Sequence, residues 1–306
     1  LDEFFMIRVS GIKQQIAARV SRQSPDGLTP SEQLKAVRTA LLPLLEQERR
    51  LLLHDLMPKL RDQGINLLNI GDLTTAQRAW VADYFRRQIF PVLTPLAFDT
   101  SRPFPFISNL SLNLAVVIQD RQQGALFARI KVPEVLPRLI ALPADLCTPA
   151  GDLPSGRQHC YVWLEQVIAA HLDSLFPGME VVEAYPFRVT RNADMEIEED
   201  EADDLLSTIE ESVRQRRFGE VVRLAVDSAM PERISSLLQK NLKIGPDDLY
   251  TVRGPLGLAD LMTLLAVDRP DLKDPPHLPA LPTALRGDTN LFNTIRQGDI
   301  LLHHPY

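Results

Sequence analysis

A helix-start signal followed by a long apolar stripe dictates a helical beginning for this chain. Thr29 can cap a helix, Pro30 suits its first turn, and Glu32 completes an S/T-x-x-E capping box. Leucine and valine then recur at helical spacing as far as about Asp62. The sequence therefore predicts a long helix with one side that faces a core.

A second amphipathic segment precedes this helix. Its apolar side chains fit one helical face, namely Phe5, Ile7, Val9, Ile12, Ile16 and Val20. Pro43 and Pro58 should kink or interrupt the longer helix, and Gln63-Gly64 offers an exit from it. Two long antiparallel helices would make a small helical domain.

After residue 64 the pattern becomes mixed. Residues 110–132 alternate apolar and polar side chains around a turn, which predicts a β-hairpin. Further strands are predicted at 179–190 and 221–226, and helices at 74–89, 164–176, 231–242 and 258–266. The fold class is therefore α+β.

The stretch from Tyr185 to Asp204 carries the first candidate site. Phe187 and Val189 alternate with Arg188 and Thr190, so a strand places the apolar pair and the polar pair on opposite faces. A turn at 191–194, an acidic run and a helix at 205–217 should follow.

Arg188 and Arg191 stand three residues apart at this strand end. Two such arginines can bind a phosphate or a carboxylate. The competing interpretation is that they pair with the acids just downstream, Asp194 or Glu196, and brace the turn. Residue types alone leave both interpretations open.

Bulk properties exclude some classes of protein. The chain has 306 residues, 45% hydrophobic content, a net charge of −7 and a pI near 5.5. A dedicated nucleic-acid or membrane-surface protein would carry a basic excess, although a local basic groove remains compatible with this charge. No apolar run reaches the roughly 20 residues of a transmembrane helix. Cys147 and Cys160 do not suggest a disulfide framework, which favours the cytosol.

Other chemistry-bearing residues give weak signals. Cys147, His159 and Cys160 lack metal-ligand spacing, and neither a P-loop nor a G-x-G-x-x-G motif occurs. The turn Gly254-Pro255-Leu256-Gly257 could offer backbone N–H groups to an anion, or could simply connect two elements. His303 and His304 have no neighbouring acid to orient them.

The two ends of the chain look cut. Leu1 already lies within a helical pattern, and the last residues follow an apolar run. The sequence is therefore expected to be a piece of a larger protein.

Six stretches together resemble the type-1 polyphosphate kinase family. They are LDEFFMIRV at 1–9, PVLTPL at 91–96, FPFISNL at 104–110, FRVTRNAD at 187–194, VRGPLGL at 252–258 and HHPY at 303–306. The resemblance implies an enzyme that reversibly transfers the terminal phosphate of ATP to polyphosphate through a phosphohistidine. It also implies Mg²⁺ and ATP as cofactors of the full-length protein, with none bound by this fragment alone.

The resemblance further implies three domains: a helical N-terminal domain at 1–64, a mixed α/β head domain at 65–285, and the start of a phospholipase D-like domain at 286–306. No catalytic residue and no metal ligand is expected in the fragment, so His303 and His304 are not the phosphorylated histidine. We expect Asp2, Glu3 and Arg8 on the nucleotide side, and Arg188, Arg191 and Arg223 as polyphosphate-binding residues.

The expected partners are ATP or ADP, inorganic polyphosphate, and a second copy of the protein. A dimer or tetramer would form through the head domain, where the loop Phe104–Phe106 could supply an exposed apolar patch, unless its rings pack on their own core. The expected location is the cytoplasm or the periphery of the inner membrane, with no nucleic acid bound. The alternative is a stand-alone anion-binding or protein-interaction module related to the head domain.

Overall fold

The fold was described from a computed structural model of the chain. The residues it describes are 1–98, 104–120, 124–147, 158–193, 219–276, 282, 285 and 290–302. The acidic run from Asp194, the predicted helix at 205–217, and His303 and His304 lie outside these residues. The chain divides into two compact units, Leu1–Leu261 and Met262–Tyr306.

The helical beginning of the chain is confirmed. The Thr29 hydroxyl accepts from the Glu32 backbone N–H, and the Glu32 carboxylate accepts from the Thr29 N–H at 2.8 Å, which closes the capping box. Helix α3 (Pro30–Leu51) continues as a π-helical segment (Leu52–Leu56) and α4 (Met57–Asp62). Pro43 lies inside α3 without ending it, because its exposed position lets water reach the carbonyl that loses its partner.

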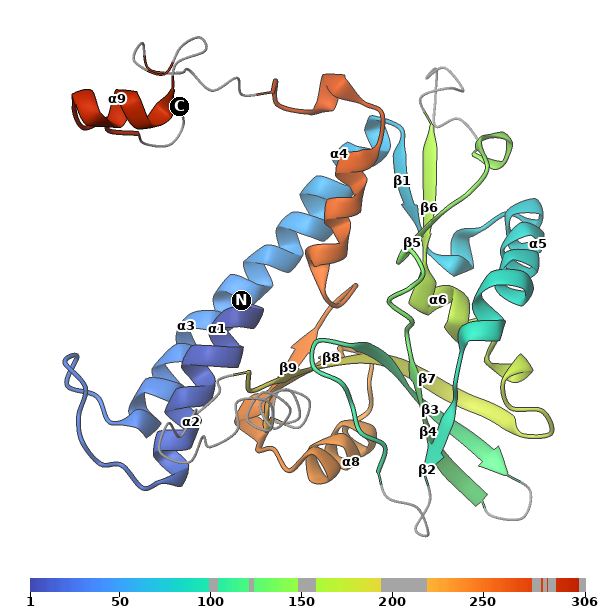
Figure 1. The fold of residues 1–306 in the computed structure, drawn as a ribbon. Helices are drawn as coiled ribbons and strands as arrows, with labels where there is room; N and C mark the ends of the chain where they lie inside the picture. Colours follow the sequence, from blue (N-terminus) through green and yellow to red (C-terminus); the bar gives the residue numbers. More distant parts are fainter. Residues whose placement is uncertain are drawn as a thin grey trace. The chain divides into compact units, whose positions relative to one another are not determined.

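The preceding segment consists of α1 (Asp2–Phe4), a π-helical segment (Phe5–Val9) and α2 (Ser10–Ala17), and it lies alongside α3 (Figure 1). Phe5, Val9 and Ile12 are buried as predicted. Ile7 and Val20 are exposed instead, because the buried stripe is narrower than the predicted face and the helix ends before Val20.

A six-stranded sheet follows, with the order β2-β4-β3-β7-β8-β9. Its strands are β2 (Leu96–Phe98), β3 (Leu112–Asp120), β4 (Gly124–Lys131), β7 (Glu180–Arg191), β8 (Val221–Asp227) and β9 (Leu249–Val252). All neighbours are antiparallel except β8 and β9. The predicted hairpin and both further predicted strands are therefore confirmed.

A smaller sheet has the order β1-β6-β5. It pairs β1 (Ile65–Leu68) parallel to β6 (His159–Trp163), and β5 (Leu139–Ala141) antiparallel to β6. Helices α5 (Thr75–Tyr84) and α6 (Leu164–Ala169) bury Val81, Leu164 and Val167 in the core that this sheet shares with one face of the large sheet.

The large sheet is covered on both faces. Phe187 and Val189 pack in a cluster with α8 (Glu232–Leu242), and Arg188 lies on the opposite face, as the alternation predicts. On that opposite face, Phe5 and Val9 pack against Val222 of β8 and Tyr250 of β9.

Short helical elements join these parts. They are the π-helical segment Phe85–Ile89 and the 3₁₀ turns Ile70–Asp72, Phe90–Val92, Ala144–Leu146, Leu172–Ser174, Pro246–Asp248 and Leu258–Ala266. The predicted helix at 258–266 is thus 3₁₀. The second unit contains the 3₁₀ turn Pro270–Leu272 and α9 (Leu291–Gln297).

Two expectations need correction. Cys147 and Cys160 form a disulfide, because a strand edge and a neighbouring turn bring their Cα atoms to 5.8 Å. Phe104 is partly buried and stacks on Phe127, while Phe106 lies beneath the Arg191 guanidinium. Of the predicted aromatic patch, Phe104 therefore packs on its own core, whereas the Phe106 side chain is 41% exposed.

Candidate functional site: an arginine-lined cavity

A cavity of about 160 Å³ lies where the N-terminal helices meet the large sheet. Its lining comes from α1, α3, β7, β8, β9 and the turn after β9, namely Leu1, Asp2, Leu45, Glu48, Arg49, Arg188, Arg223, Ala225, Val252, Leu256, Gly257, Leu258 and Ala259. Three guanidinium groups and two carboxylates are among these residues, so the lining carries one positive charge in excess.

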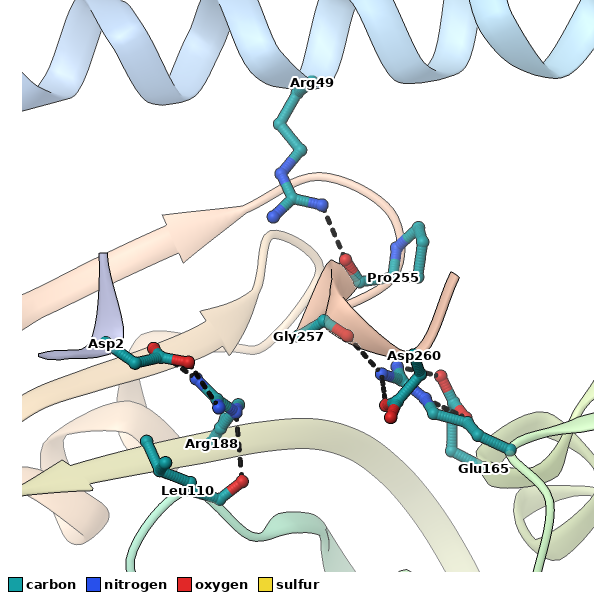
Figure 2. A network of polar contacts seen from close by, with 9 residues as sticks. Asp2, Arg49, Leu110, Glu165, Arg188, Pro255, Gly257 and Asp260 are labelled. Carbon is teal, nitrogen blue, oxygen red and sulfur yellow. Dashed lines mark hydrogen bonds and ion pairs between the residues drawn. The ribbon is translucent and has the colours of Figure 1, made fainter. Parts of the chain in front are cut away.

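Arg188 is held on both sides. Its Nη1 and Nη2 donate to the two carboxylate oxygens of Asp2 at 2.7 and 2.8 Å, and its Nε donates to the Leu110 carbonyl at 3.0 Å (Figure 2). Burial opposes the charged form of Asp2, but the hydrogen bonds and charge of Arg188, aided by Arg223, lower the pKa of that carboxyl overall. Asp2 is therefore an ionised partner that fixes Arg188 against the cavity wall.

Arg223 reaches the cavity through a β-bulge. Thr190 pairs with Arg223 and Arg191 with Val221, so Val222 is the extra residue, and both Val222 and Arg223 face the N-terminal helices. The Arg223 guanidinium lies 5.0 Å from the ring centre of Phe5 and 5.1 Å from that of Tyr250. Among the described residues, its one ion pair is with Asp2 at 4.0 Å, and its buried Nε has no hydrogen-bond partner there.

Arg49 enters from α3. Its Nη1 donates to the Pro255 carbonyl at 2.6 Å (Figure 2), and its Nη2 lies 3.4 Å from the Glu48 carboxylate. Its Nε is buried without a hydrogen-bond partner in the part of the chain that the structure describes. Burial lowers the pKa of Arg49 and also that of Arg223, but a guanidinium keeps its proton at neutral pH.

A second ionic network lies behind the cavity wall. Arg138 donates through Nη2 and Nε to the Glu165 carboxylate at 2.7 and 3.2 Å, and through Nη1 to Asp260 and to the Gly257 carbonyl. Burial opposes its charge, yet Glu165 and Asp260 raise the pKa of Arg138 overall. The charge of Arg138 is thus compensated by two carboxylates. The three cavity arginines, in contrast, have only the carboxylates of Asp2 and Glu48 among the lining residues.

The turn after β9 presents backbone acceptors at two positions. The carbonyls of Pro255 and Gly257 accept hydrogen bonds from Arg49 and Arg138. The turn therefore presents acceptors to arginines, and its role is to hold the two guanidinium groups in place.

The structure separates the predicted site residues into two sets. Asp2, Arg188 and Arg223 come together at the cavity, although sequence reasoning had divided them between nucleotide and polyphosphate sides. Glu3 and Arg8 are exposed on the first helical segment and do not line the cavity.

Arg191 lies away from the cavity, on the face of Phe187. Its Nε donates to the Ile107 carbonyl and its Nη1 to the Gly219 carbonyl, both at 2.7 Å. The predicted pairing of either arginine with Asp194 or Glu196 concerns residues outside those that the structure describes.

Arg49 and Arg138 were not predicted. In the sequence, Arg49 stands on an otherwise apolar helical stripe, and Arg138 stands beside a short strand. Many surface arginines occupy such positions, so these patterns do not mark a site. Within the described ranges, no group of three or more His, Cys, Asp or Glu side chains lies together. The residues present there do not form a Mg²⁺ site.

The fold and the cavity together define an α+β protein with a cluster of buried guanidinium groups. Models of the polyphosphate kinase N-terminal domain and middle domain match residues 1–68 and 76–264, respectively. The chain belongs to the polyphosphate kinase family.

Several curated relatives agree. Polyphosphate kinase 1 of Chlorobaculum tepidum is 47% identical over 307 residues, which cover 100% of this chain and 43% of the relative. The polyphosphate kinase of Synechocystis sp. is 47% identical and is covered to 44% of its length, and that of Aphanizomenon baltica is 46% identical and is covered to 81%. The chain spans less than half the length of the first of these relatives.

A solved structure shares the fold. The crystal structure of polyphosphate kinase from Porphyromonas gingivalis superposes with a TM-score of 0.73 at 24% identity, over 100% of this chain and 41% of that one. The predicted fold class, a helical N-terminal region followed by mixed sheets with helices, is thereby confirmed.

Proposed function

We propose that this chain is the N-terminal and head portion of an enzyme that reversibly transfers the terminal phosphate of ATP to polyphosphate. Transfer would proceed through a phosphohistidine outside this chain, with Mg²⁺ held elsewhere in the full-length protein. The observation that carries the proposal is the consecutive match of two polyphosphate kinase domain models over residues 1–68 and 76–264.

In this proposal the chain positions substrates and supplies no catalytic residue. Arg188 and Arg223 are the polyphosphate-side candidates that lie together at the cavity, and Arg191 is a separate candidate on the other face. Asp2, Glu3 and Arg8 remain the nucleotide-side candidates. The cavity, with its excess of positive charge, supports a role in handling phosphate groups.

The test compares the full-length protein with the 306-residue chain. Each is given ATP, Mg²⁺ and a short polyphosphate primer, and polyphosphate and acid-labile protein phosphate are measured. We expect polymer growth and labelling with the full-length protein only. Transfer by the 306-residue chain alone would contradict the proposed division of labour, and no polymer from the full-length protein would overturn the function.

The protein is further proposed to form a dimer or tetramer through the head domain in the cytoplasm. Because Cys147 and Cys160 form a disulfide, the cysteine content no longer favours a cytoplasmic location. None of the helices in the described ranges is long and apolar enough to cross a membrane. Sedimentation at micromolar concentration tests the assembly, and a strictly monomeric species would exclude it.

A further inference from the structure

We propose that the cavity between α3 and the large sheet binds one phosphoryl group, through Arg49 and Arg223. The group would be free orthophosphate or the end of a polyphosphate chain, which share the same tetrahedral oxyanion. The proposal deepens the function proposed above, on which its choice of anion rests.

The first argument is an unmet hydrogen-bonding capacity. Arg49 and Arg223 are 8% and 6% exposed, and the Nε–H of each has no acceptor among the residues that the structure describes. A buried donor without an acceptor costs free energy, so such groups are normally paired. Because two such donors line one cavity, we infer that an acceptor other than the described residues completes the site.

The second argument is charge. Asp2 is committed to Arg188 through two short hydrogen bonds, and Glu48 is 45% exposed and 3.4 Å from Arg49. Arg223 has its nearest carboxylate at 4.0 Å. The guanidinium groups are thus only partly compensated, and a phosphate dianion would bring the missing charge together with acceptor oxygens.

The third argument is size. One water takes roughly 30 Å³ in the liquid, so a cavity of about 160 Å³ has the room of about five waters. A tetrahedral oxyanion with a few waters fits this space. A whole nucleotide needs a site of roughly 300 Å³ or more, so no more than a terminal phosphoryl group would enter this cavity.

The direction in which Asp2 changes anion affinity distinguishes a phosphoryl site from a cavity with a purely structural role. It is the carboxylate nearest to both Arg188 and Arg223, so it competes electrostatically with a bound anion. Removal of its charge should tighten anion binding, whereas removal of the Arg49 charge should weaken it. A cavity that merely packs two elements together would show neither effect.

The experiment is a calorimetric titration of the 306-residue chain with orthophosphate and, separately, with tripolyphosphate, in a buffer free of other multivalent anions. The variants are Arg49→Gln and Asp2→Asn. The matched control is Arg87→Gln, which removes the same charge from an exposed residue paired with Asp83 on another element. Thermal unfolding of each variant checks that it is folded.

We expect Arg49→Gln to weaken binding by roughly tenfold or more, since it removes a charged donor of hydrogen bonds to the anion. Asp2→Asn should tighten binding about threefold or more at low salt, and less at high salt. Arg87→Gln should leave binding unchanged. Preference for orthophosphate would identify the free ion as the ligand, and preference for tripolyphosphate would identify the chain end.

Binding of neither anion at millimolar concentration would overturn the proposal. Equal affinities in folded Arg49→Gln and Arg87→Gln variants would overturn it as well. If Arg49→Gln does not fold, the Asp2→Asn result decides, because weaker binding there contradicts the predicted sign. No step of this test needs turnover, so its failure is distinguishable from failure of the transferase function.

Discussion

Arg138 and Glu165 show how single residues stabilise the sheet junction. Their side chains are 9% and 7% exposed, and their charges lie 2.7 Å apart. The Arg138 guanidinium also lies over the Trp163 ring at 5.2 Å. The pair therefore fixes β6 and α6 to the turn after β9, and each charge depends on the other for compensation.

We predict that Glu165→Gln lowers the free energy of unfolding by about 3 kcal/mol, because it leaves the Arg138 charge buried with half-exposed Asp260 as its remaining carboxylate. The control is Asp83→Asn, which breaks exposed pairs with Arg86 and Arg87 and should cost under about 1 kcal/mol. Urea unfolding measures both. Equal losses would show that burial adds nothing to the Arg138 pair.

A second prediction concerns the titration of Asp2. Its pKa in the folded chain lies below its ordinary value of 3.8, because Arg188 outweighs the cost of burial. A carboxyl with a depressed pKa contributes stability above its unfolded pKa, and this contribution is lost as the pH falls through the folded value.

The stability difference between the parent chain and Asp2→Asn should therefore be constant from about pH 7 to pH 5 and shrink below about pH 4. Urea unfolding at a series of pH values measures it, and the acids common to both proteins cancel in the difference. A difference that grows on acidification would contradict the assigned role of Arg188.

Only part of the site could be predicted from the sequence. Arg188 was found because alternation with Phe187 and Val189 marks a strand face. Its partner Asp2 lies 186 positions away in sequence, and no local pattern encodes such a pairing. Arg49 is one arginine among many on a helix, and only the packing of α3 on the turn after β9 gives it a site.

At the scale of elements, the turn after β9 packs closely against two arginines. Gly257 has φ +65°, and an added Cβ would lie 3.3 Å from the Arg188 Nε and 3.4 Å from the Arg138 Nη1. A glycine is needed here both for the left-handed backbone and for the approach of two guanidinium groups.

We predict that Gly257→Ala destabilises the chain by about 2 kcal/mol or more, through backbone strain and displacement of both arginines. The control is Gly27→Ala, at φ +78° with nothing within 4 Å of an added Cβ, where strain alone should cost about 1 kcal/mol. Thermal or urea unfolding compares them. If the two variants lose the same stability, the arginines yield to the methyl group without cost.

The elements themselves were largely predictable, because capping boxes and alternation are local signals. Thr29 and Thr74 both cap helices through the predicted type of motif. The parallel pairing of β1 with β6 was not predictable, since it joins strands about 90 residues apart with no shared turn. The bulge at Val222 escaped prediction for a similar reason, because it is defined by the register against β7.

At the scale of the whole molecule, the helical segment 1–62 belongs to the compact unit Leu1–Leu261. Phe5, 1% exposed, packs with Val222 and Tyr250 of the sheet, and Arg188 pairs with Asp2. The boundaries 1–64, 65–285 and 286–306 remain a prediction. The contacts nevertheless indicate that the first two of these parts depend on each other for stability.

We predict that the helical segment and the head unfold together in urea. The chain's two tryptophans, Trp80 and Trp163, report on the head by fluorescence, whereas α3 with its 22 residues contributes strongly to helical circular dichroism. Coincident transitions by both probes are expected for one cooperative unit. Phe5→Ala should lower both midpoints equally, because it removes about 3–5 kcal/mol from the shared core. A dichroism midpoint below the fluorescence midpoint, or a loss in Phe5→Ala confined to dichroism, would instead show that residues 1–64 form an independently unfolding domain.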